Sequence, residues 1–392
     1  MKVLVVGPFV PWPLDSGGRI RTFHLARAAS RAGVELEGWF VGDDRDPRAL
    51  ERELERAGGF AVRVFDRTRV GAFERFTRAK YERWFASDHL RDALRARFES
   101  DPPDLVHADE MSVLRSVPRT PCPLVVHHHK LDLEFHARAY GDGLAARFDR
   151  AKVRGLETRA AQRTLHHVVC SEDDRDALLD RHPSLVVTAV PSGVDERAFD
   201  PDAFCADAPL AREPRRLLVL GSLDYEPNVD GLEWLARDVL PRVDADATVR
   251  VVGRDPIERV RDLCAQDARL ELVGPVDDVR EELARASLLL VPLRIGGGTR
   301  LKIVEALAMT TPVLSTTIGA EGLDLDADQI ERADDAASFA AAIATHLGAP
   351  DAAYGRGARG RATVLERLTW DALAARVLGA WRDAADRAPR IG

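Results

Sequence analysis

The hydrophobic pattern of this chain alternates between two kinds of segment. Short continuous apolar runs predict buried strands, and longer segments with an apolar residue at every third or fourth position predict amphipathic helices. The predicted strands of the first half are 2–7, 36–41, 60–65, 104–107, 124–128, 167–170 and 185–190, and those of the second half are 216–221, 248–253, 270–274, 288–292 and 313–316. Helices between successive strands are typical of parallel sheets that are covered on both faces.

The alternation weakens between residues 199 and 214, where prolines and acidic residues occur without periodicity. Such a segment is typical of a linker. We therefore predict an N-terminal domain over 1–198, a linker over 199–214, a second domain over 215–368 and a final helix over 369–392. The predicted fold is α/β, with two Rossmann-like α/β/α domains whose parallel sheets face a central cleft, and ligands are expected there, beyond the carboxyl ends of the strands.

The clearest candidate for a binding site lies between residues 288 and 323. This segment predicts a strand, a glycine triplet, a helix over 299–309 and a second strand, which together form a βαβ unit. The triplet consists of Gly296, Gly297 and Gly298. Glycines let the backbone approach a ligand closely, and the unpaired N–H groups at a helix N-terminus suit a phosphate. Thr299 is the expected N-cap of this helix.

Three charged residues of the same helix indicate a ligand. Arg300 and Lys302 lie in the first turn, where cations oppose the helix dipole unless an anion binds between them. Glu305 projects within the inward, apolar stripe of the helix. Its carboxylate either accepts hydrogen bonds from ligand hydroxyls or forms a salt bridge with a neighbouring helix.

A second glycine-containing loop follows the first predicted strand. Ser16, Gly17, Gly18 and Arg19 lead into a helix over 20–31, which again allows a ligand to approach at the carboxyl end of a strand. The loop lacks the full G-x-G-x-x-G pattern, so a nicotinamide-type dinucleotide site is disfavoured.

Three consecutive histidines, His127, His128 and His129, follow a predicted strand of the first domain. Neighbours on a strand point to opposite faces, so the three cannot converge on one metal ion, and we predict no metal site. His107 and Asp109 lie at the end of the preceding strand. They either border an acceptor or cap the sheet.

Composition narrows the class of protein. The chain has 392 residues, of which 45% are hydrophobic and 31% are charged, and this is enough for two globular domains. A net charge of −8 argues against a general nucleic-acid binder. No apolar run approaches the roughly 20 residues that span a bilayer, and a strand begins directly after Met1, so we expect a cytoplasmic location without a signal peptide.

A basic and aromatic stretch over 63–85 leaves two interpretations open. Its interleaved arginines and aromatic rings either touch an anionic acceptor or the inner face of a membrane, or belong to an ordinary pair of helices. The oligomeric state stays undefined by the sequence.

Taken together, the motifs resemble those of the retaining glycosyltransferases of family four, which have the GT-B fold. The resemblance covers essentially the whole chain. It rests on the segments 16–19, 170–174, 191–195, 221–231, 274–278 and 288–322, the last of which contains the glycine-triplet form G-G-G-T-R-L-K at 296–302. Thr369 and Trp370 open a last helix that crosses back onto the first domain in that family.

The resemblance implies transfer of a hexosyl-type sugar, with retention, from a UDP- or GDP-sugar to a glycan, lipid-linked glycan or natural-product acceptor. The nucleotide sugar is a co-substrate, and no cofactor or metal is expected. Donor-binding residues implied in this way are Gly17, Gly18, Ser222, Gly296, Gly297, Gly298, Thr299 and Glu305, whose carboxylate accepts the ribose hydroxyls. The implied catalytic residues are His129, Arg300 and Lys302, and those on the acceptor side are Arg19, His107 and Asp109.

Two departures from the family pattern matter. Gly297 stands where the family usually has a glutamate that contacts the donor sugar, and the loop 222–226 carries none of the usual diphosphate-binding cations. We infer that Arg300 and Lys302 supply this charge from the helix instead. The alternatives are a catalytically silent homologue that binds sugar nucleotides, a GT-B nucleotide-sugar 2-epimerase and, less in keeping with the motifs, an oxidoreductase.

Overall fold

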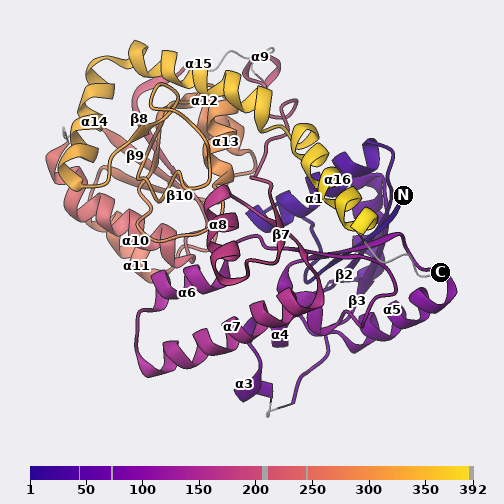
Figure 1. The fold of residues 1–392 in the computed structure, drawn as a ribbon. Helices are drawn as coiled ribbons and strands as arrows, with labels where there is room; N and C mark the ends of the chain where they lie inside the picture. The colour runs from indigo at the N-terminus through magenta and orange to yellow at the C-terminus, as the bar shows by residue number, and fades with distance from the viewer. Residues whose placement is uncertain (44, 72–73, 205–210, 244–245, 388–392) are drawn as a thin grey trace. The chain divides into compact units, whose positions relative to one another are not determined.

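The computed structural model describes residues 1–392 except 44, 72–73, 205–210, 244–245 and 388–392. The chain forms two compact units: the first contains residues 1–191 and 370–392, and the second contains residues 192–369. Each is built on a parallel sheet with helices (Figure 1), so the predicted fold class is confirmed.

The first unit contains a seven-stranded parallel sheet of order β3-β2-β1-β4-β5-β6-β7. Its strands are β1 (Lys2–Gly7), β2 (Glu35–Val41), β3 (Ala61–Phe65), β4 (Leu105–Asp109), β5 (Leu124–His127), β6 (His166–Val169) and β7 (Val186–Ala189). All seven were predicted, because each is a short apolar run. The strand order reverses between β1 and β4, and doubly wound sheets bind ligands at such a switch point.

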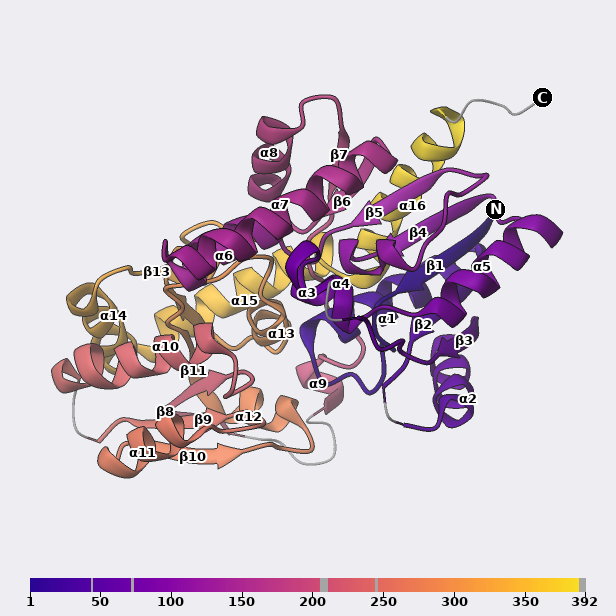
Figure 2. The same cartoon turned by 90° about the horizontal axis from the view of Figure 1, so that it is seen from below.

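The helices of the first unit include one from the far end of the chain. They are α1 (Gly17–Arg31), α2 (Pro47–Gly58), α3 (Glu74–Thr77), α4 (Lys80–Trp84), α5 (Asp88–Ser100), η1 (Met111–Arg115), α6 (Asp132–Tyr140), α7 (Leu144–Arg163), α8 (Glu172–Arg181) and α16 (Trp370–Arg387). Helix α16 lies beside α1 (Figure 2). The ring of Trp370 stacks on His24 of α1, with centroids 5.4 Å apart, so residues from both ends of the chain share one core.

The second unit contains a six-stranded parallel sheet of order β10-β9-β8-β11-β12-β13. Its strands are β8 (Glu213–Leu220), β9 (Thr248–Val252), β10 (Leu270–Gly274), β11 (Ala286–Val291), β12 (Val313–Ser315) and β13 (Glu331–Arg332). Its helices are α9 (Pro201–Phe204), α10 (Glu226–Trp234), the π-helical turn η2 (Leu235–Val239), η3 (Leu240–Arg242), α11 (Glu258–Gln266), α12 (Val279–Arg285), α13 (Leu301–Ala308), α14 (Ala336–Gly348) and α15 (Pro350–Arg367). The sequence did not predict β13, because two charged residues give no strand pattern.

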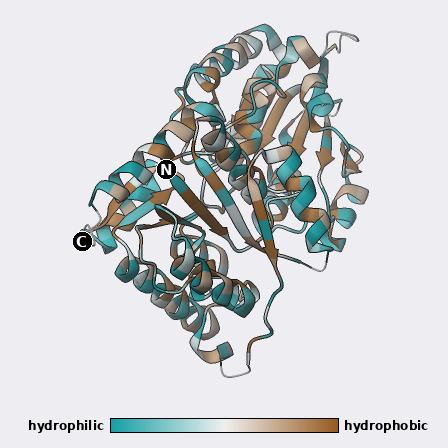
Figure 3. Cartoon of the chain, turned by 90° about the vertical axis from the view of Figure 1, so that its right-hand side faces the viewer, coloured by the Kyte–Doolittle hydropathy of each residue, from teal (hydrophilic) through white to brown (hydrophobic). Residues whose placement is uncertain are grey.

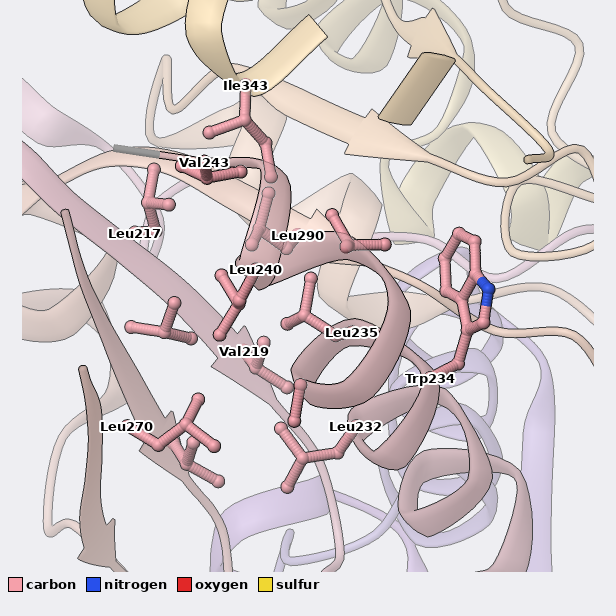
Figure 4. Packing of buried hydrophobic residues seen from close by; sticks show 14 of the residues in the cluster. Leu217, Val219, Leu232, Trp234, Leu235, Leu240, Val243, Leu270, Leu290 and Ile343 are labelled. Atoms are coloured by element: carbon pink, nitrogen blue, oxygen red, sulfur yellow. The ribbon is translucent and has the colours of Figure 1, made fainter. Parts of the chain in front are cut away.

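Packing against one face of this sheet forms the main core of the second unit. Leu217 and Val219 from β8 meet Leu290 from β11 and Ile343 from α14 (Figure 4), and all four are buried. In Figure 3 the strands are the most hydrophobic parts of this unit. Burying one such side chain fully stabilises a fold by about 1.5–3 kcal/mol, so the core fixes the strand ends from which the candidate site is built.

The segment expected to be an irregular linker is more regular than the sequence suggested. Helix α9 lies within 199–214, and β8 already begins at Glu213, while 205–210 lie outside the described residues. An exposed, short helix buries no apolar stripe, which is why periodicity does not reveal it.

Residues 63–85 form the end of β3 and the short helices α3 and α4 in their described part. Phe76 and Trp84 are exposed by 68% and 50%, and the Lys80 ammonium lies 4.1 Å from the centre of the Trp84 ring. Glu82 is buried between Arg78 and Arg159. The ordinary pair of helices that one of the two interpretations expected is therefore present, and the rings of Phe76 and Trp84 are exposed on it. No helix in the described ranges is both long and apolar enough to cross a membrane.

Candidate active site

The loop after β1 brings the first turn of α1 close to a histidine. Helix α1 begins at Gly17, earlier than the predicted start at residue 20. A Cβ atom on Gly18 would lie 3.2 Å from the Phe9 ring and 3.4 Å from Nδ1 of His129, so the glycine allows this close approach. The Arg19 guanidinium donates to both carboxylate oxygens of Asp15, at 2.9 and 3.0 Å.

Asp109, at the carboxyl end of β4, is the centre of a buried polar cluster. Its side chain is held by donors from three other segments. The Nε2 atom of His129 lies 2.9 Å from Oδ1, the Thr22 hydroxyl of α1 donates to Oδ2, and Nδ1 of His127 lies 3.2 Å from Oδ1. His107 lies further away, with Nε2 at 3.8 Å.

The protons of two of these histidines follow from their other partners. Arg21 donates from Nε and Nη2 to Nε2 of His127, at 3.1 and 2.9 Å, and a guanidinium can only donate. Nδ1 of the neutral ring therefore carries the proton that faces Asp109. Trp381 of α16 likewise donates to Nδ1 of His107 at 3.0 Å, which leaves the proton on Nε2.

The same cluster is the obvious place to look for a metal. Ligand atoms of His107, Asp109 and His127 lie within 4.8 Å of one another. The ring nitrogens that face Asp109 carry protons, however, and a metal ligand needs a free lone pair there. The donor set therefore fits a buried carboxylate better than a cation.

The three consecutive histidines lie at the end of β5 and just after it, and they alternate in direction. His127 and His129 share one face and both reach Asp109, whereas His128 points away to His167, with Nε2 and Nδ1 2.8 Å apart. Sequence reasoning excluded convergence of all three but missed that two of them converge on Asp109. The signal was available, because residues two apart on a strand lie on one face.

Burial and pairing give these groups distinct charges. Burial alone would raise the pKa of Asp109, but His129 and its other donors hold that pKa well below its usual range. Burial, with the Arg21 charge, lowers the pKa of His127 well below its usual range, so this ring is neutral. For His129 burial is outweighed by Asp109, and its pKa is raised. The two shifts favour an ion pair between a protonated His129 and an ionised Asp109.

In the second unit, the glycine loop before α13 is folded around Arg300. The helix begins at Leu301 with Arg300 in the cap position, so the prediction that Thr299 is the N-cap is wrong. Thr299 Oγ1 instead accepts a hydrogen bond from the backbone N–H of Ser192, at 2.8 Å. A Cβ atom on Gly296 would lie 2.0 Å from Nη2 of Arg300, so the guanidinium could keep this position only beside a glycine.

Arg300 contacts the loop itself. Its Nη1 donates to the carbonyl oxygens of Gly297, at 2.5 Å, and Gly298. The guanidinium therefore fixes the conformation of the glycine triplet in this structure.

Lys302 points instead towards the end of β8. Its ammonium donates to the carbonyl of Leu220 and to Oδ1 of Asn228, the latter at 3.0 Å. A Cβ atom on Gly221 would lie 2.9 Å from the Lys302 nitrogen, so the glycine leaves room for this charge. Burial, reinforced by the Arg300 charge, lowers the pKa of Lys302 to about 7.

Glu305 lies one turn after Lys302 on the same helix. In the part of the chain that the structure describes, its carboxylate forms no salt bridge and accepts no side-chain hydrogen bond, so the salt-bridge alternative is not observed. Burial raises its pKa to about 7, with Lys302 acting against the shift. Ser222, in the loop after β8, donates to Asp224 at 2.7 Å. The site therefore combines a cation whose pKa is lowered with a carboxylate that has no salt-bridge partner among the described residues.

A surface hollow elsewhere in this unit is a weaker candidate for the ligand site. It lies at the amino ends of β8, β9 and β10, and is lined by Glu213, Pro214, Arg215, Arg216, Thr248, Arg250 and Glu271. Its arginines are already paired, as in the 2.7 Å contact of Arg216 with Glu282. Doubly wound sheets bind ligands at the opposite, carboxyl ends of their strands.

Two doubly wound units with parallel sheets of seven and six strands define the GT-B class of glycosyltransferase fold. Similar solved structures include sucrose-phosphate synthase from Thermosynechococcus elongatus, with a TM-score of 0.77 and 19% identity over 99% of this chain and 100% of that one. HepE from Anabaena, in complex with UDP-glucose, has a TM-score of 0.69 and 14% identity over 98% of this chain and 100% of that one. TarM from S. aureus, in complex with UDP, has a TM-score of 0.70 and 10% identity over 97% and 100%.

The sequence itself matches two glycosyltransferase family models. Residues 16–198 match the model described as Glycosyltransferase Family 4, and residues 214–348 match the model described as Glycosyl transferases group 1. The chain is thus a GT-B glycosyltransferase of the group 1 and family 4 type. Comparison with curated proteins gave no significant match.

Proposed function

We propose that this protein transfers a hexosyl-type sugar from a nucleoside-diphosphate sugar to an acceptor, with retention of configuration. The observation that carries the proposal is that Lys302 and Glu305 lie one turn apart on α13 and do not form a salt bridge with each other in the described structure. Burial lowers the pKa of Lys302 and raises the pKa of Glu305, in each case to about 7. A diphosphate would restore the charge of Lys302, and hydroxyl groups would stabilise the carboxylate of Glu305.

The arrangement supports a donor site in which α13 provides the missing loop cation. Lys302 reaches the carbonyl of Leu220, next to the loop where related enzymes usually place their diphosphate-binding cations. We assign Lys302 to the diphosphate and Glu305 to the ribose hydroxyls. The glycine triplet, Thr299 and Ser222 would line the rest of the donor site, and Arg300 would hold the triplet in shape and add positive charge.

The chemistry assigned to these residues is stabilisation of the leaving group. A positioned cation stabilises the charge that develops on the diphosphate, so the reaction needs no metal or other cofactor for this step. His129 would position the donor sugar or the acceptor next to Gly17 and Gly18. Asp109 and His107 are buried, and this favours a supporting role over the direct acceptor contact that we expected.

UDP is the first candidate for the nucleotide and GDP the second. Among the similar structures, HepE is described in complex with UDP-glucose and TarM in complex with UDP. The acceptor is a glycan, a lipid-linked glycan or a natural product. The exposed Phe76 and Trp84 leave open a peripheral contact with the inner face of a membrane.

Thermal unfolding in the presence of UDP, GDP, dTDP and ADP tests the donor class. A nucleotide at about 100 times its Kd stabilises the fold by roughly 2.7 kcal/mol, so one diphosphate should raise Tm well above the others. The corresponding nucleotide sugar should then be consumed in the presence of an acceptor, with the anomeric configuration read by NMR. If no nucleoside diphosphate shifted the unfolding curve, the proposed donor site would be wrong.

A catalytically silent homologue is the second candidate, because Gly297 replaces the glutamate that usually contacts the donor sugar. Such a protein would bind a nucleotide sugar and release it unchanged, whereas a transferase also hydrolyses its donor slowly. A 2-epimerase would convert the donor without any acceptor. Incubation with donor alone, followed by NMR of the sugar, distinguishes these outcomes.

A further inference from the structure

We propose that Asp109 is the positioning residue of His129: it accepts the Nε2–H of the ring and so leaves Nδ1–H directed towards the start of α1, beside Gly18. The inference rests on the proposed function, because it assigns to His129 a place next to the reacting sugar. Asp109 itself would contact neither substrate, since its side chain is only 3% exposed whereas that of His129 is 10% exposed.

Several hydrogen-bond donors hold the Asp109 carboxylate in one orientation. Thr22 of α1 donates to Oδ2, and His127 of β5 and His129 both face Oδ1. His127 cannot turn away, because Arg21 binds its opposite nitrogen and also donates to the carbonyl of Val190. Donors from one helix, one strand and the segment that follows this strand thus orient a single acceptor, and this acceptor in turn orients the ring of His129.

The surroundings of Nδ1, the ring nitrogen of His129 that does not face Asp109, are also known. The Phe9 ring packs against it, with centroids 6.2 Å apart at 69°, and a Cβ atom on Gly18 would lie 3.4 Å from Nδ1. Glu110 places Oε1 3.6 Å from the same Nδ1, which is too long for a hydrogen bond. Glu110 has a φ of +109°, and residues held in such sparsely populated backbone regions cluster at functional sites.

The charges around His129 favour a protonated ring. Asp109 and Glu110 face it with negative charge; Arg21 of α1 and Lys130 are the nearby cations, and Lys130 is paired with Asp132 at 2.9 Å. His127, with ring centroids 4.9 Å away, is neutral. The balance raises the pKa of His129.

A protonated His129 is a hydrogen-bond donor and cannot act as a general base. Its Nδ1–H would be directed at an oxygen of the sugar or acceptor, while the proton of the acceptor would go to the leaving phosphate. Activity would then be present while the imidazolium persists and would fall as pH rises through the raised pKa of His129. Loss of Asp109 would move this fall to lower pH.

The pairing can be measured without knowledge of the substrate. NMR of protein with labelled histidine rings, with His129 identified by its absence in H129Q, gives its titration directly. In the wild type His129 should lose its proton above the pKa of a free histidine, and in D109N the titration should move down by about one to three units. The matched control is E157Q, which neutralises another buried carboxylate of the same unit that pairs with Arg181 and His182. E157Q should leave the His129 titration unchanged.

Several outcomes would overturn the proposal. His129 could titrate at or below the pKa of free histidine in the wild type, D109N could leave its titration in place, or E157Q could move it equally. The wild-type titration decides the question alone if D109N does not fold. Donor turnover supplies the second readout: the alkaline fall of kcat should move to lower pH in D109N, at an unchanged KM for donor. A wild type that consumes no nucleotide sugar refutes the proposed function and leaves the NMR result intact.

Discussion

The candidate sites of the two units are built in opposite ways. In the first unit, Asp109 is saturated with donors, and its pKa is held well below the usual range. In the second unit, no side chain among the described residues donates a hydrogen bond to Glu305, and burial raises its pKa to about 7. Asp109 is buried and Glu305 is only partly buried, yet the more deeply buried carboxylate has the lower pKa, so the difference lies in their partners.

In the first unit the protein itself supplies the partners of the buried charges, whereas in the second unit we expect a ligand to supply them. A buried charge costs several kcal/mol unless it is paired, and the first unit supplies the pairing from α1, β5 and the residues after β5. In the second unit, Lys302 and Glu305 both have a pKa of about 7. Binding of an anion can therefore be coupled to protonation of Lys302, and binding of hydroxyl groups to ionisation of Glu305. The first arrangement suits orientation, and the second suits binding.

Replacing Lys302 by Ala should have the largest effect on the candidate site of the second unit. If the ammonium stabilises the leaving diphosphate, turnover should fall by at least about 10- to 100-fold. Initial rates at saturating donor measure this. R259A is the matched control, because Arg259 is a half-exposed cation of the same unit and should leave turnover unchanged. Near-normal turnover of K302A would remove the assigned role of Lys302.

Replacing Gly221 by Ala should disturb the same cation through the backbone. Gly221 has a φ of +147°, and an added Cβ atom would lie 2.6 Å from Nδ2 of Asn228 and 2.9 Å from the Lys302 nitrogen. We expect a loss of about 1–3 kcal/mol in the free energy of unfolding, with weaker nucleotide binding. G348A is the control, since a Cβ atom there meets no atom within 4 Å. Equal stability of the two variants in denaturant would contradict the close packing around Lys302.

The affinity for the nucleoside diphosphate should depend on pH on both sides of about pH 7. Lys302 must be protonated to bind the diphosphate, so affinity should fall as pH rises through its lowered pKa of about 7. Glu305 must be ionised to accept hydroxyl groups, so affinity should also fall as pH drops through its raised pKa of about 7.

Calorimetric titration from pH 5.5 to 8.5 tests this dependence. In E305Q the acid-side fall should disappear, and affinity at pH 7 should be about tenfold weaker, as expected for the loss of a hydrogen bond to a charged group. An E305Q variant with unchanged affinity and pH dependence would show that the ribose does not bind Glu305.

Replacing Gly18 by Ala should have the smallest effect. The new Cβ atom would lie 3.2–3.4 Å from Phe9 and His129, so these rings need to move by only a few tenths of an ångström. We expect stability to change by less than about 1 kcal/mol and kcat to fall a few-fold, because a displacement of about 1 Å near the chemistry costs roughly 100-fold. A fall in kcat as large as that of K302A would show that the candidate site of the first unit tolerates less displacement than the many hydrogen bonds to Asp109 suggest.

Much of the fold was predictable from local pattern. The strands up to β12 were each found as an apolar run, and the βαβ unit around the glycine triplet was found with its charged residues. What failed were features without an apolar signal, such as α9, β13 and the cap of α13. Among the residues that we propose for the donor site, Glu305 has no salt bridge within the described structure, in agreement with its position in an apolar stripe. The contact of Arg300 with its own loop had no counterpart in the sequence pattern.

By itself, the sequence determined the order of the elements and which chemical groups stand at the ends of strands, because strand and helix periodicity is local. Only the tertiary structure decided the state of those groups. Arg21 and His127 are 106 positions apart, and His107 and Trp381 are 274 positions apart, yet these contacts fix the protons around Asp109. The loss of water around Lys302 and Glu305 likewise arises from packing, and desolvation sets the charge of a side chain only once the chain is folded.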